Sequence, residues 1–143
     1  MKGLNRQEGG LFVDQVSIAE IVKKYGTPAY IYSASKIKEN LSNYIDVVGE
    51  NDKVCYSVKS NSNIHVLSML SKLGSGFDVV SGNELRKCLM AGAKPQSIVF
   101  SGVGKTKEEI KLALKENIFS INIESEGELK RIIEVSSSLG TQA

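Results

Sequence analysis

The sequence predicts an α/β protein in which about four consecutive strand–helix units form a parallel sheet covered by helices. From residue 54 onward, the hydrophobic pattern alternates strictly between strand-like and helix-like stretches. The expected strands, at 54–59, 76–80, 97–101 and 118–124, start at intervals of 22, 21 and 21 residues. Short, regular units of this kind are typical of parallel sheets whose helices pack outside.

The expected helices carry their own start signals. A Ser or Thr followed three residues later by Glu is a capping box, in which the two side chains satisfy unpaired amides at the helix start. It occurs at residues 81–84, 106–109 and 125–128, between an expected strand and the helix that follows it in three of the four units.

The first part of the chain has a different pattern. A further capping box at residues 17–20 predicts a helix that stops at Gly26, because glycine favours the left-handed conformation that closes a helix. The Thr-Pro pair at 27–28 then forces extension, so residues 29–32 predict a short strand. A second helix is expected from about Ser35.

Composition excludes several classes of protein. The 143 residues carry 18 Lys or Arg and 16 Asp or Glu, without the run of like charges that is typical of a nucleic-acid-binding tail. No apolar run approaches the ~18 residues of a membrane helix, and the first residues show no signal peptide. Cys55 and Cys88 have no partners at metal-ligand spacing. We therefore expect a cytoplasmic protein with no metal, no membrane and no nucleic-acid partner.

The length leaves two architectures open. Four units suffice for a small doubly wound sheet, whereas a (β/α)8 barrel needs eight units and ~250 residues. The sequence stops after the fourth expected helix, where a fifth strand would start. It therefore predicts either a complete small α/β domain or half a barrel.

Lys59 is the most informative position for chemistry. Alternation along residues 54–59 directs Cys55, Ser57 and Lys59 to the face opposite the helices. Lys59 is then inward at the carboxyl end of a parallel strand, where α/β folds place ligands. A desolvated lysine is nucleophilic and forms a Schiff base with a carbonyl compound. The alternative is a strand-end lysine that extends its amine into solvent.

Asp78 repeats this geometry one strand later. Phe77 and Val79 are expected to face the helices, so Asp78 points inward beside Lys59. A carboxylate there favours the charged form of a neighbouring amine. The alternative is that Asp78 caps a loop amide.

Other candidate sites are weaker. Residues 101–106 follow a strand and open a helix, as a phosphate loop does, but Val99 stands where that motif requires glycine. We expect a tight strand-to-helix turn instead. His65 has no ligand partner at suitable spacing. Cys55 has no base near it in sequence and is expected to be a packing residue.

Four motifs resemble one family when they are taken together and in order. They are Gly-Thr-Pro-Ala-Tyr-Ile-Tyr at 26–32, Tyr-Ser-Val-Lys-Ser-Asn-Ser-Asn at 56–63, Gly-Ser-Gly-Phe-Asp-Val-Val-Ser-Gly-Asn-Glu-Leu at 74–85 and Phe-Ser-Gly-Val-Gly-Lys-Thr at 100–106. They resemble the diaminopimelate decarboxylases, which have the alanine-racemase-like fold (fold type III) among pyridoxal-phosphate enzymes. The resemblance extends from about residue 9 to 139.

The resemblance implies a fold, a cofactor and a reaction. Residues 1–34 are then a leader partly associated with a C-terminal β domain, and 35–143 are the N-terminal part of a (β/α)8 TIM-type barrel. Lys59 is implied as the catalytic lysine that holds pyridoxal 5'-phosphate (PLP), and Asp78 as a cofactor-binding neighbour. The substrate is the small amino acid meso-2,6-diaminopimelate, the products are L-lysine and CO2, and the intact enzyme is a homodimer.

The resemblance also implies what these residues lack. The family's cofactor-stacking histidine, glycine-rich phosphate loop, acid at the pyridine nitrogen and C-terminal β domain are all expected beyond residue 143. Asn83 replaces the second glycine of the usual Gly-Gly-Glu-Leu. We therefore expect these 143 residues to be inactive alone. The alternatives are a small non-catalytic α/β binding module that holds a phosphate at 102–106, or a PLP-handling protein of the same barrel type without decarboxylation.

Overall fold

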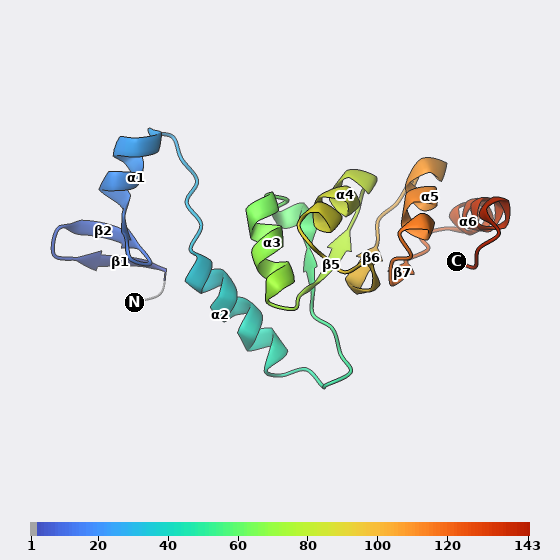
Figure 1. Ribbon diagram of the computed structural model, residues 1–143, viewed down its shortest axis with the longest axis horizontal. Helices are drawn as coiled ribbons and strands as arrows, with labels where there is room; N and C mark the ends of the chain where they lie inside the picture. The colour runs from blue at the N-terminus through green and yellow to red at the C-terminus, as the bar shows by residue number, and fades with distance from the viewer. Residues whose placement is uncertain (1–2) are drawn as a thin grey trace. The chain divides into compact units, whose positions relative to one another are not determined.

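The computed structural model describes residues 3–143 and divides the chain into two compact units (Figure 1). The first unit extends to Val47, and the second comprises residues 48–143. Each unit has its own sheet.

The first unit is an antiparallel three-stranded sheet followed by two helices. Its elements are β1 (Leu4–Gln7), β2 (Gly10–Val13), β3 (Val16–Ser17), α1 (Ile18–Tyr25) and α2 (Ala34–Ile45). Both predicted helices are confirmed, and Gly26 closes α1 with a φ of 79°. The predicted capping box at Ser17 is wrong in detail, because its side chain makes no capping hydrogen bond. The strand predicted at residues 29–32 is also wrong: this segment pairs with no strand of the described chain, and Tyr30 is 93% exposed.

Asp14 joins the sheet of the first unit to the start of α2. Its Oδ1 accepts hydrogen bonds from the Gly3 amide at 2.9 Å and from the hydroxyls of Ser33 and Ser35. Oδ2 accepts from the Ser35 amide. These bonds hold the pKa of the Asp14 carboxyl well below its usual range, with the Ser35 hydroxyl as the largest cause.

The second unit confirms the predicted strand–helix alternation. Its parallel strands lie in chain order: β4 (Cys55–Ser57), β5 (Gly76–Val79), β6 (Ile98–Phe100) and β7 (Ser120–Ile121). The helices that follow them are α3 (Ile64–Lys72), α4 (Gly82–Met90), α5 (Lys107–Lys115) and α6 (Glu126–Leu139), with short 3-10 turns η1 (Val58–Ser60) and η2 (Pro95–Ser97). Figure 1 shows the four helices in succession along the sheet.

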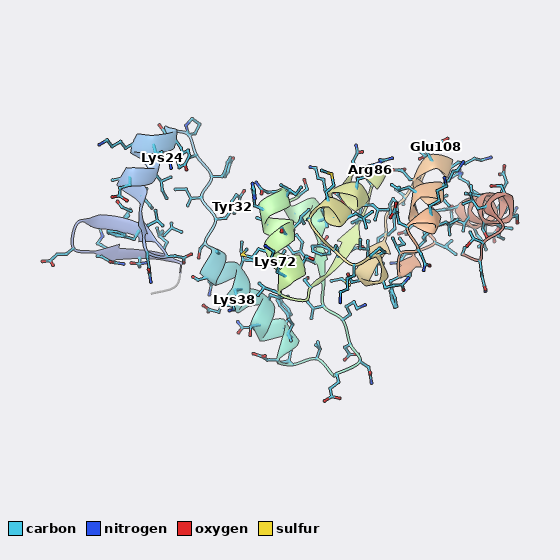
Figure 2. All side chains as sticks on the ribbon, viewed as in Figure 1. Lys24, Tyr32, Lys38, Lys72, Arg86 and Glu108 are labelled. Atoms are coloured by element: carbon cyan, nitrogen blue, oxygen red, sulfur yellow. The ribbon has the colours of Figure 1, made fainter. Side chains whose placement is uncertain are left out.

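The core of the second unit lies between the sheet and these helices. Phe77, Val79, Ile98 and Phe100 are completely buried, as the alternation predicts. They pack with the inward faces of the helices, of which Leu67, Leu85 and Ile110 are completely buried. Charged residues, Lys72 among them, occupy the exposed helix faces, where Figure 2 shows Arg86 and Glu108 projecting outward.

The predicted caps at Ser81, Thr106 and Ser125 are confirmed, and each side chain accepts a hydrogen bond from the amide three residues on. Only the helix at Thr106 has the complete reciprocal box. Glu84 and Glu128 instead accept from the amides of Val80 and Glu124, the residues just before the caps. Each of these carboxylates therefore ties a helix start to the end of the preceding strand.

Glu109 caps two helices at once. One carboxylate oxygen accepts from the Thr106 amide at 3.0 Å, and the other accepts from the Gly82 amide at the start of α4 at 2.8 Å. A Cβ at Gly82 would lie 2.9 Å from the Glu109 Cγ, so glycine allows this close approach.

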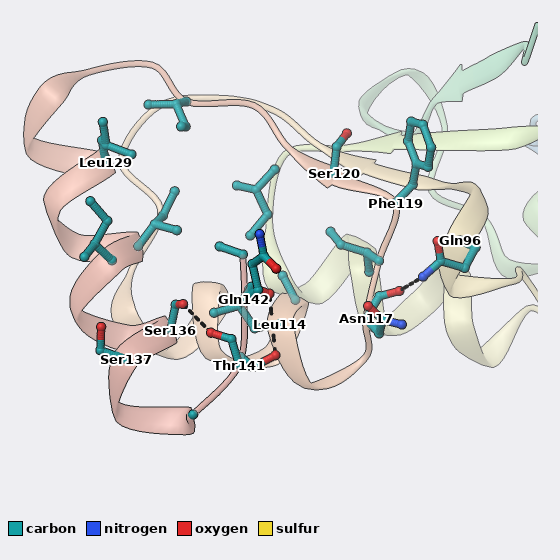
Figure 3. Close-up of a pocket in the computed structure, with 18 residues that line it drawn as sticks. Gln96, Leu114, Asn117, Phe119, Ser120, Leu129, Ser136, Ser137, Thr141 and Gln142 are labelled. Carbon is teal, nitrogen blue, oxygen red and sulfur yellow. Dashed lines mark hydrogen bonds between the residues drawn. The ribbon is translucent and has the colours of Figure 1, made fainter.

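The two edge strands, β4 and β7, have no outer partner among residues 3–143. Beside β7, a groove of about 920 Å³ opens along α6 (Figure 3). Apolar side chains including Leu114, Phe119 and Leu129 line it.

Among the described residues, no helix is long and apolar enough to cross a membrane.

Candidate active site

The predicted site residues gather where the parallel strands of the second unit end. Ser57, the last residue of β4, pairs in register with Asp78 of β5. Lys59 follows two residues later on η1. The carboxyl ends of β4 and β5 therefore bring an amine and a carboxylate to the same edge of the sheet.

Lys59 differs from expectation in its surroundings. The predicted desolvation is not observed among residues 3–143: Lys59 lies on η1, two residues after β4 ends at Ser57, and its side chain is exposed. Its amine forms no ion pair or hydrogen bond with any residue in 3–143. Val58 beside it is completely buried and anchors the turn. The lysine is thus a free amine on a fixed backbone.

Asp78 has one occupied and one unoccupied carboxylate oxygen. The Ser101 hydroxyl, just after β6, lies 2.5 Å from Asp78 Oδ1. The side-chain amide of Asn122, just after β7, donates to Ser101 Oγ at 3.1 Å. Oδ2 accepts no hydrogen bond from the described part of the chain. The alternative role for Asp78, capping a loop amide, is not observed there.

The predicted turn at residues 101–106 is confirmed, and the amine of its lysine is buried where it could not contact a phosphate. Lys105 is 2% exposed, and its amine donates to the carbonyls of Gly102 and Asn122, each at 2.7 Å, and to Glu128 Oε2 at 3.1 Å. All three acceptors belong to the chain itself. This arrangement is wrong for a phosphate loop, whose lysine must reach its ligand.

Cys55 is a packing residue, as predicted. Burial raises the pKa of its thiol above the usual value, against the opposing charge of Lys53. Gly76 pairs with Cys55 in register, and a Cβ at Gly76 would lie 2.7 Å from the Cys55 sulfur and 2.8 Å from the Ser97 carbonyl oxygen. The missing side chain is what lets β4, β5 and η2 approach.

Two further features of the strand ends are not apparent from the sequence. The Ser57 hydroxyl is buried without a hydrogen-bond partner among residues 3–143. Ser101 and Asn122 form a polar chain with Asp78, although they come from three different strand ends. Their one sequence signal is a small polar residue on the inward-facing alternation at the end of each strand. Chemically, the edge offers a free amine, a carboxylate oxygen and an unpartnered hydroxyl.

Comparison with known proteins identifies the relatives of this site. Residues 34–141 match the family described as pyridoxal-dependent decarboxylase, pyridoxal binding domain. The chain is 45% identical over 139 residues to the diaminopimelate decarboxylase of Vibrio cholerae. This match covers 96% of the chain and 33% of that relative. The chain thus spans about a third of the length of the curated relatives it matches.

Solved structures agree with this assignment. A diaminopimelate decarboxylase from M. jannaschii in co-complex with L-lysine matches with a TM-score of 0.93 at 36% identity, over 99% of this chain and 34% of that one. The Helicobacter pylori enzyme complexed with L-lysine matches with a TM-score of 0.85 at 44% identity, over 89% of this chain and 32% of that one. These matches confirm the predicted N-terminal portion of a barrel. The chain therefore belongs to the pyridoxal-dependent decarboxylase family, through the match of residues 34–141 to its pyridoxal binding domain.

Proposed function

We propose that this chain supplies the cofactor-holding part of a diaminopimelate decarboxylase, which converts meso-2,6-diaminopimelate to L-lysine and CO2. The observation that carries the proposal is the unpaired amine of Lys59, at the carboxyl end of the first parallel strand and at the same sheet edge as Asp78. In the proposed reaction, one carbon–carboxylate bond breaks and CO2 leaves. A proton takes its place on the α-carbon.

The residues at this edge fit PLP. Lys59 offers a primary amine with no competing partner in the described part of the chain, and a primary amine is the group that attaches an aldehyde covalently. Within residues 3–143, the buried Ser57 hydroxyl has no hydrogen-bond partner, and one oxygen of the Asp78 carboxylate accepts no hydrogen bond. When bound, PLP supplies an electron sink for the pair released with CO2.

The chain's own residues have separate roles in this proposal. Lys59 holds the cofactor through its side-chain nitrogen and later returns a proton to the α-carbon of the product. Asp78 lies beside the cofactor and provides a fixed negative charge toward ammonium groups. Lys105 takes no part, because its amine is buried against three acceptors.

The proposal extends to the whole enzyme. Residues 1–34 serve as a leader that partly joins a C-terminal β domain, and 35–143 form the first part of the barrel. The intact enzyme is a cytoplasmic homodimer, and the remaining cofactor contacts come from its later part. The isolated 143 residues do not decarboxylate.

The test uses a chimera in which these residues replace the matching third of the Vibrio cholerae enzyme. The chimera is incubated with PLP, reduced with borohydride to fix the lysine-bound cofactor, and mapped by peptide mass spectrometry. We expect the label on Lys59 and CO2 release from meso-diaminopimelate. Lys59→Arg, which keeps the charge, should abolish both, whereas Lys53→Arg should leave both intact. Label on Lys53 or Lys105 in the active chimera is the result that rules the assignment out.

A further inference from the structure

Hydrogen-bond directions can be followed along the chain from Asn122 to Asp78. An amide nitrogen only donates, so Asn122 Nδ2 gives its hydrogen to Ser101 Oγ at 3.1 Å. Ser101 then has its single hydroxyl hydrogen left to donate, and its other neighbour is Asp78 Oδ1 at 2.5 Å. Both donors therefore point toward the carboxylate, which ends the chain as the final acceptor.

The far end of this chain is fixed by buried groups. The backbone carbonyl of Asn122 accepts from the Lys105 amine at 2.7 Å, and the backbone N–H of Asn122 donates to the Phe100 carbonyl at 2.9 Å. Glu128, 3% exposed, holds the Lys105 amine in turn. The backbone of Asn122 is therefore held on both sides, which fixes the position from which its side chain reaches Ser101.

These contacts leave Asp78 with a defined orientation. Oδ1 is engaged, and Oδ2 is left without a donor from residues 3–143. We propose that Ser101 and Asn122 are positioning residues, which aim Asp78 so that Oδ2 receives an ammonium group of the amino-acid substrate. This inference rests on the proposed function, and it deepens it by naming the substrate group that the carboxylate recognises.

A double-mutant cycle in the Vibrio cholerae chimera tests the inference. Ser101→Ala removes the donor to Asp78, so the carboxylate loses its fixed direction. We expect KM for meso-diaminopimelate to rise about tenfold, as for the loss of one hydrogen bond to a charged group, while kcat changes much less. The Kd of L-lysine, measured by calorimetry without turnover, should rise by the same factor. Asn122→Ala should act in the same direction.

The cycle separates positioning from a general structural role. If Ser101 acts through Asp78, then Ser101→Ala adds nothing to Asp78→Asn, and the two effects are not additive. Ser101→Thr keeps the hydroxyl and should restore KM. Ser71→Ala is the matched control. The Ser71 hydroxyl also donates to one acceptor, the Gly92 carbonyl at 2.8 Å, but it lies on α3 and not at the carboxyl ends of the strands. This variant should leave KM and Kd unchanged.

The outcomes are distinct. An unchanged KM and Kd in Ser101→Ala, or fully additive effects with Asp78→Asn, overturn the inference while Lys59 labelling still supports the proposed function. Failure of the unmodified chimera to attach PLP at Lys59 removes both. A KM increase that Ser101→Thr rescues and that disappears in the Asp78→Asn background supports the inference.

Discussion

Lys105 Nζ lies 3.1 Å from Glu128 Oε2, and the two side chains are only 1% and 3% exposed. Lys107 and Glu134 form a second ion pair between α5 and α6, but there the side chains are 53% and 63% exposed. The second unit therefore contains a buried pair and an exposed pair that join neighbouring parts of the chain. Comparing them shows how burial changes the contribution of an ion pair to the free energy of unfolding.

We expect Lys105→Met to lower the free energy of unfolding by about 3 to 5 kcal/mol, because it leaves a buried carboxylate without its cation. Lys107→Met should cost less than about 1 kcal/mol, since water screens the exposed pair. Urea unfolding of both variants at one protein concentration measures the difference. Equal losses in the two variants would contradict the role assigned to burial. Lys105→Met combined with Glu128→Leu should recover part of the loss.

Acid should weaken the first unit through Asp14. Because its hydrogen bonds lower the pKa of this carboxyl in the folded state, the stabilisation is complete above the unfolded value of about 3.9. It is lost as the pH falls toward the lower folded value. Asp14→Asn should remove this pH dependence and loosen the start of α2. Amide exchange of Gly3 and Ser35 between pH 2 and 6 measures both effects.

Asp46→Asn is the control for that experiment. Asp46 ends α2, and its carboxylate accepts only a 3.3 Å bond from the Ser42 hydroxyl. The acid dependence of Gly3 and Ser35 should be the same in this variant as in the parent chain. If Asp46→Asn reduces the pH dependence of amide exchange at Gly3 and Ser35 as strongly as Asp14→Asn does, the assignment to Asp14 is wrong.

Gly76 and Gly127 should respond to alanine in opposite ways. At Gly76 the new Cβ would lie within 2.8 Å of the Cys55 sulfur and the Ser97 carbonyl oxygen, so we expect a loss of about 1 to 3 kcal/mol from overpacking. Gly127 is in α6, and the nearest side-chain atom would be 3.9 Å away. Alanine there should stabilise the helix by about 0.5 to 1 kcal/mol. Thermal unfolding of both variants checks the two signs.

The isolated 143 residues should associate and should not turn over meso-diaminopimelate. The unpaired edges of β4 and β7 and the groove along α6 favour pairing with other copies. Ile133→Glu, in the groove at a residue 56% exposed, should shift the chain toward monomer. Val103→Glu, outside the groove and 84% exposed, should not. Size-exclusion chromatography and a CO2 assay with excess PLP test this, and an active monomer would contradict it.

The second unit was predictable because its signals are local. Helical periodicity, Ser or Thr caps and strand alternation each depend on residues a few positions apart, and they gave all four strand–helix units. The sheet of the first unit was missed because its strands are short and partly exposed; Leu4 and Val16 are 67% and 50% exposed. Tyr30 and Tyr32 suggested a strand, but a strand needs a partner that local sequence does not reveal.

The site was predictable only in part, for the same reason. Alternation brought Lys59 and Asp78 to one edge, but it did not predict that β4 ends at Ser57 and that Lys59 lies on the 3-10 turn η1. The burial of Lys105 depends on Asn122 and Glu128, which lie 17 and 23 residues further along the chain. The polar chain to Asp78 needs the spatial order of three strands. No pattern within a single motif contains that information.

The shared carboxylate of Glu109 limits how this domain can be recombined with its relatives. The donor at Gly82 and the acceptor at Glu109 lie on successive helices, 27 residues apart. A crossover anywhere between them can pair Glu109 with a residue other than glycine at position 82, whose Cβ would lie 2.9 Å from the Glu109 Cγ and force that side chain to shift. Chimeric libraries should therefore place their junctions before residue 82 or after 109 and inherit the two helix starts as a single block.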